Sequence, residues 1–500
     1  ITYNSVSDIL ENKKVKKAQT SSVQSGRRHK ISLWAALLPI VALLGCLVTI
    51  IAVDGPDAIA GYSPYALLGA ATLAVIVAAA AGTLSLRGIK LGLARSARQI
   101  LPAVPMLFCI AVVATTWMVS GVVPTLICYG LAWLNPTFFL VSTCLICAVV
   151  SVLTGSSWST IATIGVAFMG IGTVMGYNAG WIAGAIISGA YFGDKISPLS
   201  DTTVVASSAC GVDLFAHMRY LMLSSVPALT VALIVFACAG LATDLSGVSE
   251  DSGELQKALD GIFNISPVTL LIPLITLLMI AFRIPTLLTL ATSGLMGAIG
   301  IFVFQPQLGH NILSASLTIW GGNNVNAISG LDASVADLIS TGGILGMLPT
   351  VFLVLSAMMF GAALIGTGLL AIVTDAFVRR LHRRQSIVGA TVASGLMMNS
   401  TTADQYLSLI ITGNMFRNLY RRYGLEPRLL SRTIEDSVSV TSVLIPWNSC
   451  GITQSTVLGV ATLTYLPFCV FNWLSPCMSI ILAWTGWKIR TIHRANVATA

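Results

Sequence analysis

The residues that could do chemistry are the acids that lie inside apolar stretches, because most of the chain's 19 acidic residues fall in tails or loops. They are Asp194, Asp201, Asp404, Glu435 and Asp436, with Lys195 the one lysine among them. An ionisable group in an apolar environment is costly, so it usually binds an ion, relays a proton or pairs with another charge. These six residues are the candidates for a cation and proton site.

Two of the acids lie beside an expected break in a helix, in the segment 193–203. Pro198 removes a backbone donor and disfavours helical structure at Ser197. The freed carbonyl groups, together with carboxylate and hydroxyl oxygens, are hard ligands that suit Na⁺ or Li⁺. The alternative is that Asp194 and Lys195 form an internal charge pair that only fixes packing.

A second break is expected at 445–451, where Pro446 frees a carbonyl group and Asn448 and Ser449 add neutral oxygens. This segment is the predicted counterpart of the first break. The alternative is a kinked helix that serves packing alone.

The remaining acids have competing explanations. Asp404, beside Gln405 and after the polar run 399–402, is expected at the tip of a hairpin. It binds ions there or is simply exposed to the cytoplasm. Glu435 and Asp436 are expected to begin a helix, whose N-terminus favours acids. That position alone would explain them.

Several other chemistries lack their motifs. The sequence has no GxxxxGK[ST] for nucleotide phosphates and no GxSxG, and no His lies near the serine-rich stretches. The one CxxC, from Cys144 to Cys147, lies in an apolar run without a second CxxC or a partner His, so we interpret it as buried packing. We therefore expect neither an enzyme nor a bound cofactor.

Composition decides the class of protein. Of the 500 residues, 55% are hydrophobic and 9% are charged, and the mean hydropathy is +0.87. A soluble domain carries about a quarter charged residues, so this chain must be an all-α polytopic membrane protein. The net charge of +8, from 27 basic and 19 acidic residues, fits cytoplasmic loops rich in Lys and Arg and does not require nucleic acid as a partner.

The apolar runs and basic clusters predict a topology. Runs of about 20 residues cross a bilayer, and the clear candidates are 31–53, 63–84, 101–119, 220–241, 266–282 and 285–304. With the basic clusters inside and the acidic segment 244–260 outside, 386–411 starts and ends inside. It is too short for two crossings, so we expect a re-entrant hairpin. Together these assignments predict about ten membrane crossings, two hairpins and both termini in the cytoplasm.

Each half has a hairpin with a polar tip followed by a broken helix, and the two hairpins enter from opposite sides, as in an inverted-topology repeat. The tips are expected at 154–160 and 399–405. The predicted layout begins with a basic cytoplasmic tail at 1–30 and a first membrane repeat at 31–242, which has a hairpin near 136–174 and a broken helix near 193–203. An acidic external loop at 243–265 follows. The second repeat, at 266–487, has a hairpin near 386–411 and a broken helix near 445–451, and a cytoplasmic tail at 488–500 follows it.

Five motifs resemble the NhaC-type Na⁺/H⁺ antiporters of the ion-transporter superfamily. They are the run 184–203, which ends GDKISPLSDTT, together with GVDLF at 211–215, ADQYL at 403–407, EDS at 435–437, and PWN at 446–448 followed by Cys450-Gly451. The resemblance spans roughly 101–487. Two motifs depart from the expected pattern: Ser159 stands where a Gly should follow Trp158, and Val438-Ser439 replace Gly-Thr.

The resemblance implies an inverted repeat with two hairpins, usually in a homodimer whose transport domain moves against a scaffold. It implies a secondary antiporter in a bacterial inner membrane that exchanges Na⁺, or Li⁺, for H⁺. The same family includes exchangers that couple Na⁺ and lactate to H⁺ and malate, so this organic-acid exchange is the alternative. A passive cation channel is a third possibility.

Na⁺ and H⁺ are expected to compete for the same carboxylates, because an uncompensated buried charge is costly. Asp201 and Asp404 are the predicted carriers and Na⁺ ligands, one from each half, while Asp194 is expected to pair with Lys195. Neutral oxygens are expected from Ser156, Ser157, Thr202, Thr401 and Asn448, with Gln405, Glu435 and Asp436 in support.

Overall fold

The computed structural model describes residues 31–54, 59–100, 103–243, 257–282, 284–309, 311–323, 340–378 and 383–489. In these ranges the regular structure is helical apart from one isolated β-bridge, between Asn323 and Thr341. Within the described ranges, seven helices are long and apolar enough to cross a membrane, or up to nine if each of two bent pairs forms one span. The prediction of an all-helical polytopic membrane protein is confirmed, while the count of ten crossings stays a prediction.

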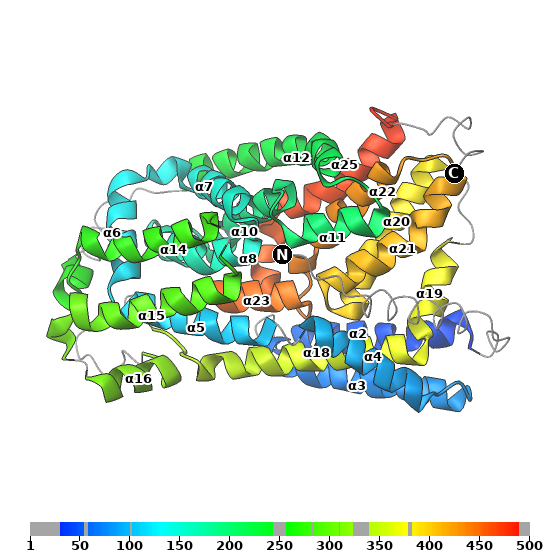
Figure 1. The fold of residues 1–500 in the computed structure, drawn as a ribbon, viewed down its shortest axis with the longest axis horizontal. Coiled ribbons are helices and arrows are strands. Elements are labelled where there is room, and N and C mark those ends of the chain that lie inside the picture. The colour runs from blue at the N-terminus through cyan, green and yellow to red at the C-terminus, as the bar shows by residue number, and fades with distance from the viewer. Residues whose placement is uncertain are drawn as a thin grey trace, which may run out of the picture.

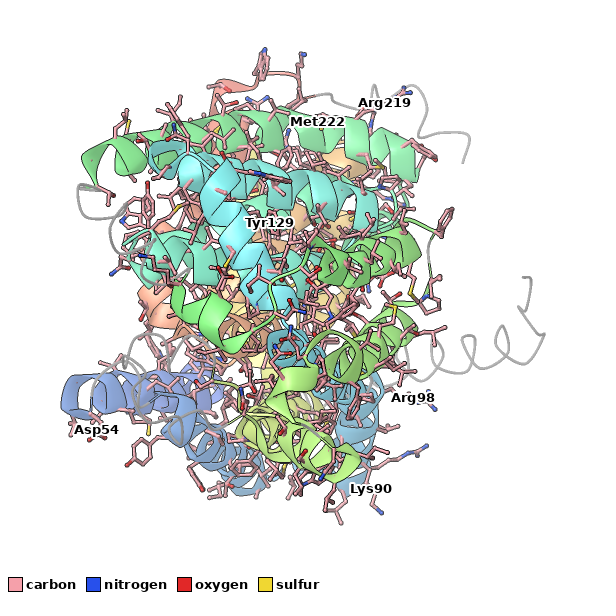
Figure 2. All side chains as sticks on the ribbon, turned by 90° about the vertical axis from the view of Figure 1, so that its left-hand side faces the viewer. Asp54, Lys90, Arg98, Tyr129, Arg219 and Met222 are labelled. Atoms are coloured by element: carbon pink, nitrogen blue, oxygen red, sulfur yellow. The ribbon has the colours of Figure 1, made fainter. Side chains whose placement is uncertain are left out.

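The helices α2 (Leu33–Asp54), α3 (Ile59–Ala80), α4 (Leu86–Ile100) and α18 (Leu348–Thr367) pack together along the lower edge of Figure 1. Close approach of α4 to α18 requires glycine, because a Cβ at Gly92 would lie 2.6 Å from the Ala362 carbonyl oxygen. The exposed basic side chains of α4 include Lys90 and Arg98, which point away from the molecule in Figure 2.

A second group of helices lies on the left of Figure 1. It contains α5 (Ala103–Val119), α6 (Val122–Trp133), α14 (Leu271–Ala281), α15 (Thr286–Phe304) and α16 (Ile312–Gly321). The helices α5 and α6 meet at an angle of 67°. The buried indole of Trp117 donates a hydrogen bond to Ser293 Oγ (3.1 Å), which ties α5 to α15.

The centre of the molecule is built around α10 (Ala179–Ile196), which packs closely on α7 (Phe139–Thr154). Gly189 and Gly193 of α10 face backbone carbonyl groups of α7, so a larger residue at either position has no room. After α7 the chain turns into α8 (Ser157–Thr160), a π-helical turn (Ile161–Gly165) and α9 (Val166–Val174). After α10 come α11 (Asp201–Cys210) and the long α12 (Leu214–Ala242), which lies along the top of Figure 1.

The later part of the chain supplies α19 (Leu369–Val378), then the antiparallel pair α20 (Arg384–Thr402) and α21 (Gln405–Arg422). It continues with α22 (Pro427–Ile434), the π-helical turn η8 (Glu435–Ser439) and the 3-10 turn η9 (Ser442–Leu444). The last helices are α23 (Ser449–Leu458), α24 (Thr462–Tyr465) and α25 (Val470–Thr485). In Figure 1, α23 lies near the centre, and α25 runs beside α12.

One sequence-based prediction about these elements is wrong. Glu435 and Asp436 do not begin a helix, because α22 already begins at Pro427 and continues into η8 without a gap. Both side chains are fully buried. The tail at 1–30, the acids from Asp244 to Glu254 and the C-terminal residues 490–500 lie outside the described residues.

Candidate functional site

Two helix–turn–helix tips in the structure have the same backbone geometry. Gly155 and Ala403 both adopt the left-handed conformation, with φ of 66° and 55°. The next residue, Ser156 or Asp404, is extended, and its side chain accepts a hydrogen bond from the backbone N–H three residues on, at 3.2 and 2.8 Å. Each tip therefore reverses the chain and caps the second helix of its hairpin.

The threonine before each tip makes the same contact in both hairpins. Thr154 Oγ1 lies 3.3 Å from Thr160 Oγ1, and Thr402 Oγ1 lies 2.7 Å from Ser408 Oγ. In both hairpins the partner hydroxyl is six residues further on. This register aligns 154–160 with 402–408, so the predicted second tip at 399–405 is displaced by three residues.

The two helix breaks also match. Helix α10 is followed by extended residues at Ser197 and Ser200, and η9 by extended residues at Ile445 and Asn448. In each break the later residue donates its backbone N–H to the carbonyl of the earlier one, at 3.3 and 3.0 Å. A proline follows the first extended residue in both, which explains why helical hydrogen bonding stops there.

Each hairpin contacts the broken helix of its own half at equivalent positions. Ser151 Oγ donates to the Ala190 carbonyl (2.6 Å), and Asn399 Nδ2 donates to the Val438 carbonyl (2.7 Å). Both donors lie three residues before the tip threonine, and both acceptors lie seven residues before the first residue of the break. The halves are thus related by contacts as well as by the order of elements.

A further pair of matching contacts lies closest to the tips, and one of the two involves an ionisable group. Ser157 Oγ donates to Asp194 Oδ2 (2.7 Å) in the first half, and Ser442 Oγ donates to Gln405 Oε1 (3.2 Å) in the second. Ser157 corresponds to Gln405, and Asp194 corresponds to Ser442. The first half therefore places its acid on the broken helix, whereas the second places its acid, Asp404, on the hairpin tip.

Asp194 and Asp201 differ in their surroundings. Asp194 is 8% exposed, and besides Ser157 it interacts with the Ser200 hydroxyl. Asp201 is exposed at the first residue of α11 and interacts with Asp194 only electrostatically. Asp194, and not Asp201, is therefore the buried acid beside the first break, while the predicted carrier role of Asp201 stays a prediction.

Asp404 is 4% exposed at the start of α21, where it caps the helix. The Tyr406 side chain lies within electrostatic range of Asp194, Asp201 and Asp404. The structure therefore brings the acids of both halves to one region around the two tips. Tyr406 was not singled out from the sequence, although it immediately follows Asp404 and Gln405 in the motif ADQYL.

Glu435 reaches from the second half to the first break. Its Oε1 accepts a hydrogen bond from Thr202 Oγ1 (3.0 Å), and it interacts electrostatically with Lys195 and Asp194. Glu435 is fully buried, and its Oε2 has no hydrogen-bond partner in the described part of the chain. Among the described residues, only one of the two carboxylate oxygens of Glu435 thus accepts a hydrogen bond.

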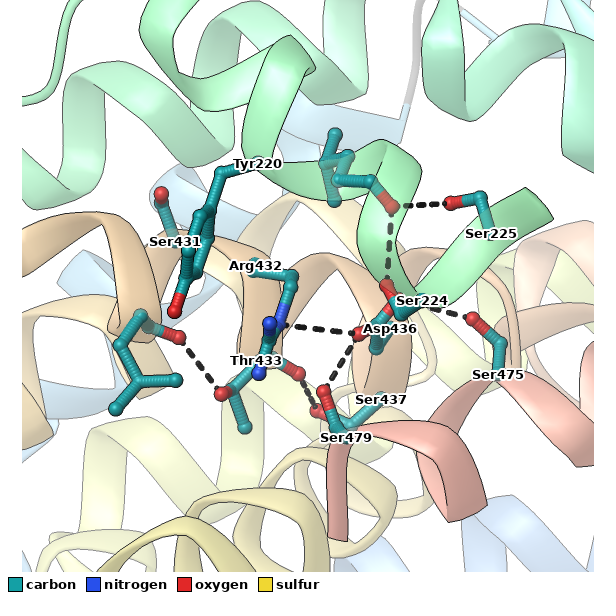
Figure 3. A network of polar contacts seen from close by, with 12 residues as sticks. Tyr220, Ser224, Ser225, Ser431, Arg432, Thr433, Asp436, Ser437, Ser475 and Ser479 are labelled. Atoms are coloured by element: carbon teal, nitrogen blue, oxygen red, sulfur yellow. Dashed lines mark hydrogen bonds and ion pairs between the residues drawn. The ribbon is translucent and has the colours of Figure 1, made fainter. Parts of the chain in front are cut away.

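Asp436 is the centre of a separate polar network, shown in Figure 3. It accepts hydrogen bonds from Ser224 (3.0 Å), Ser475 (3.0 Å) and Ser479 (2.5 Å), and its Oδ2 lies 3.9 Å from Arg432 Nε. Lys195 also forms an ion pair with Asp436 and donates to Ser475 Oγ (2.7 Å).

This network corrects the predicted pairing of Lys195 with Asp194. Neighbours on a helix point in different directions, so adjacent residues do not face each other. Asp194 contacts the first hairpin tip, whereas Lys195 reaches Asp436 on η8. The lysine is therefore already paired, and it leaves Asp194 uncompensated.

The other predicted ligands have varied positions. Ser156 caps α8, and Asn448 caps α23 while its Nδ2 donates to the Asn399 carbonyl (3.0 Å). Thr401 bonds back to the Met397 carbonyl of its own helix (2.9 Å). Ser200, which was not predicted, lies within interaction range of Asp194. Its place at the restart of a helix after a proline was the available signal.

A family model described as the Na⁺/H⁺ antiporter family matches residues 14–213 and 189–487, which include both tips and both breaks. The chain belongs to the Na⁺/H⁺ antiporter family. The resemblance inferred from the five motifs is confirmed. Members of this family are transporters that operate in membranes, in agreement with the apolar helices of the fold.

Relatives of this antiporter-family chain carry different cargoes by name. The Na⁺/H⁺ antiporter NhaC of Alkalihalophilus pseudofirmus is 36% identical over 75% of this chain and 80% of its own. The malate-2H⁺/Na⁺-lactate antiporter of Bacillus subtilis is 35% identical over 77% and 81%. The arginine/ornithine antiporter ArcD of Halobacterium salinarum is 34% identical over 80% and 81%. The comparisons therefore establish the family, but its members transport different substrates, so the substrate of this chain has to be inferred from its own site.

Proposed function

We propose that this protein is a secondary antiporter that exchanges Na⁺, or Li⁺, for H⁺. The observation that supports this cargo is the unbalanced negative charge at the tips. Within the described ranges the ion pairs reach none of Asp194, Asp404 and Glu435, while Lys195 is engaged by Asp436. Buried carboxylates with hydroxyl neighbours attract a small hard cation.

The exchange follows from the cost of burying an uncompensated charge. Asp194 and Asp404, at 8% and 4% exposure, lie in surroundings where an empty ionised carboxylate is unfavourable. A bound proton or a bound Na⁺ removes that penalty. Both loaded forms of the site therefore change conformation more easily than the empty one, which couples Na⁺ movement to H⁺ movement in the opposite direction.

The wider arrangement is part of the same proposal. The tips at Gly155 and Ala403 belong to re-entrant hairpins of an inverted repeat, with both termini in the cytoplasm of a bacterial cell and the protein in its inner membrane as a homodimer. The matching tips and breaks support the repeat, the basic clusters support the re-entrant hairpin and the cytoplasmic termini, and the resemblance of the motifs supports the inner membrane and the homodimer. The transported ions are the only small molecules that this mechanism requires, and it includes no catalytic reaction.

A second candidate is exchange of organic acids, as in the malate and lactate relative. The observation that favours it is Arg432, which is fully buried and whose guanidinium nitrogens have no hydrogen-bond partner in the part of the chain that the structure describes. A guanidinium group binds carboxylates with two parallel hydrogen bonds. Arg432 is held near Asp436, however, and so part of its charge is already balanced.

Everted membrane vesicles with a pH-sensitive dye distinguish the candidates. Addition of Na⁺ to vesicles with a preformed pH gradient is expected to dissipate the gradient without lactate or malate. Movement of protons only when the organic acids are added would establish the second candidate instead. Na⁺ flux without proton counterflow would indicate a passive channel.

A further inference from the structure

A line of hydroxyl groups leads from a buried carboxyl group in one half of the molecule to a buried carboxyl group in the other. Ser200 interacts with the Asp194 carboxylate, and its Oγ lies 2.9 Å from Thr202 Oγ1. Thr202 Oγ1 in turn donates to Glu435 Oε1 (3.0 Å). All four side chains are buried, with Thr202 at 4% exposure and Ser200 at 0%.

The hydroxyl groups of this line are not used for helix capping. Ser200 occupies the N-cap position of α11, yet its side chain makes no capping hydrogen bond. Thr203 and Ser207, on the same helix, instead donate to backbone carbonyl groups. The two hydroxyl groups between Asp194 and Glu435 are thus directed at each other, and Thr202 is also directed at the Glu435 carboxyl group.

We propose that Ser200 and Thr202 form a proton relay between Asp194 and Glu435. The inference rests on the proposed Na⁺/H⁺ exchange and adds the route by which the proton moves within the site. A hydroxyl group both donates and accepts, and either oxygen of the Ser200–Thr202 pair can be the donor. The hydrogen bonds along these hydroxyl groups can therefore point in either direction. In one direction Asp194 holds the proton, and in the other Glu435 holds it.

One transfer balances as follows. The O–H bond of protonated Asp194 breaks and its proton bonds to Ser200 Oγ, which passes its own proton to Thr202 Oγ1. Thr202 passes its proton to Glu435 Oε1. No electrons are exchanged, and both hydroxyl groups are regenerated. Asp194 is left ionised and free to bind Na⁺, while Glu435 becomes neutral.

The surroundings of Glu435 suit a temporary proton site. The charged groups of Lys195 and Asp194 on α10 interact electrostatically with the Glu435 carboxyl group, as does Cys210 of α11. Asp436 is the next residue on η8. Lys195 is held by Asp436, so it balances Glu435 only in part. Glu435 therefore has a partial counter-charge and an oxygen without a hydrogen bond in the described part of the chain, Oε2, besides the one that Thr202 contacts.

The test compares Thr202→Val, which removes the hydroxyl group at nearly constant volume, with Thr202→Ser and with Thr203→Val as a matched control. In proteoliposomes, the maximal rate of Na⁺/H⁺ exchange in Thr202→Val is expected to fall at least about tenfold, with the Na⁺ concentration for half-maximal rate unchanged. Thr202→Ser restores the rate, and Thr203→Val retains it.

Radioactive Na⁺/Na⁺ exchange, which needs no proton, provides the second measurement. Thr202→Val is expected to retain it, which also shows that the variant is folded. The relay is wrong if Thr202→Val exchanges Na⁺ for H⁺ at the wild-type rate, or if it loses Na⁺/Na⁺ exchange in parallel, because Thr202 would then be a Na⁺ ligand. Absence of Na⁺/H⁺ exchange in the wild-type protein would instead overturn the proposed function.

Discussion

Ser156 and Asp404 occupy the same position in the two hairpins. Each is the extended residue after a left-handed turn, and each caps the helix that follows it. The two positions thus share a capping role but differ in charge, since a hydroxyl group stands in one half and a carboxyl group in the other. This difference separates the structural role of the position from the transport role that we propose for Asp404.

Asp404→Asn is expected to reduce Na⁺-driven proton movement at least about tenfold, because the amide cannot exchange a proton for Na⁺. The protein should remain folded, since Asn caps helices as well as Asp does. The matched change Ser156→Ala should lower stability by about 1 kcal/mol through loss of the cap. Dye-based exchange assays and thermal unfolding in detergent measure the two effects. Normal exchange by Asp404→Asn would contradict the proposed role of Asp404.

Asp194→Asn is expected to abolish exchange, since Asp194 is buried, accepts a hydrogen bond from Ser157 at the first tip and interacts with Ser200 of the proposed relay. Asp201→Asn should change the Na⁺ concentration for half-maximal rate by less than about tenfold, because exposed charges contribute at most about 1 kcal/mol. Initial rates over a range of Na⁺ concentrations in proteoliposomes distinguish the two variants. Loss of exchange in Asp201→Asn with retention in Asp194→Asn would return the carrier role to Asp201.

Lys195→Met is expected to lower the free energy of unfolding by about 3–5 kcal/mol, because it leaves Asp436 buried with only the more distant Arg432 as a counter-charge. The double change Lys195→Met with Asp436→Leu should be less destabilising than the sum of the single changes. Thermal unfolding of the purified proteins in detergent measures this coupling. Additive effects would show that the ion pair does not stabilise the fold.

Gly92→Leu is expected to destabilise the protein by about 1–3 kcal/mol, since the added side chain meets the backbone of α18 at Ala362 and Gly366. Gly69→Leu provides a matched control, because a Cβ at Gly69 meets no atom within 4 Å. The melting temperatures of both variants, measured side by side, give the result. Equal stability of the two would mean that α4 and α18 do not pack as closely as the structure shows.

A cysteine at Asn414 tests the proposed re-entrant hairpin. The side chain is exposed near the middle of α21, and the basic clusters on either side of the hairpin predict cytoplasmic access. A background without the native cysteines is needed, because Cys46, Cys238 and Cys477 are exposed. We expect labelling by an impermeant maleimide in everted vesicles. Labelling only from the outside of intact cells would contradict the re-entrant hairpin and, with it, the proposed inverted repeat.

Hydropathy and proline positions were enough to predict the class of protein and several local features. The apolar runs at 31–53 and 63–84 correspond to α2 and α3, and Pro198 and Pro446 lie in the two helix breaks. These features depend on the residues themselves, because a proline cannot donate a helical hydrogen bond and an apolar run of that length favours a membrane helix. Tertiary contacts do not alter either property.

The sequence by itself determined that this protein is a helical membrane protein with two helix breaks at prolines and with acids in apolar stretches. Only the tertiary structure decided which acids face which partners. Lys195 pairs with Asp436 across 241 positions of the chain, and Glu435 approaches Thr202 across 233. Such pairs depend on how helices pack and rotate against one another, and adjacent residues on a helix point in different directions. Sequence order therefore suggested the neighbour Asp194 for Lys195, whereas packing selected a distant residue.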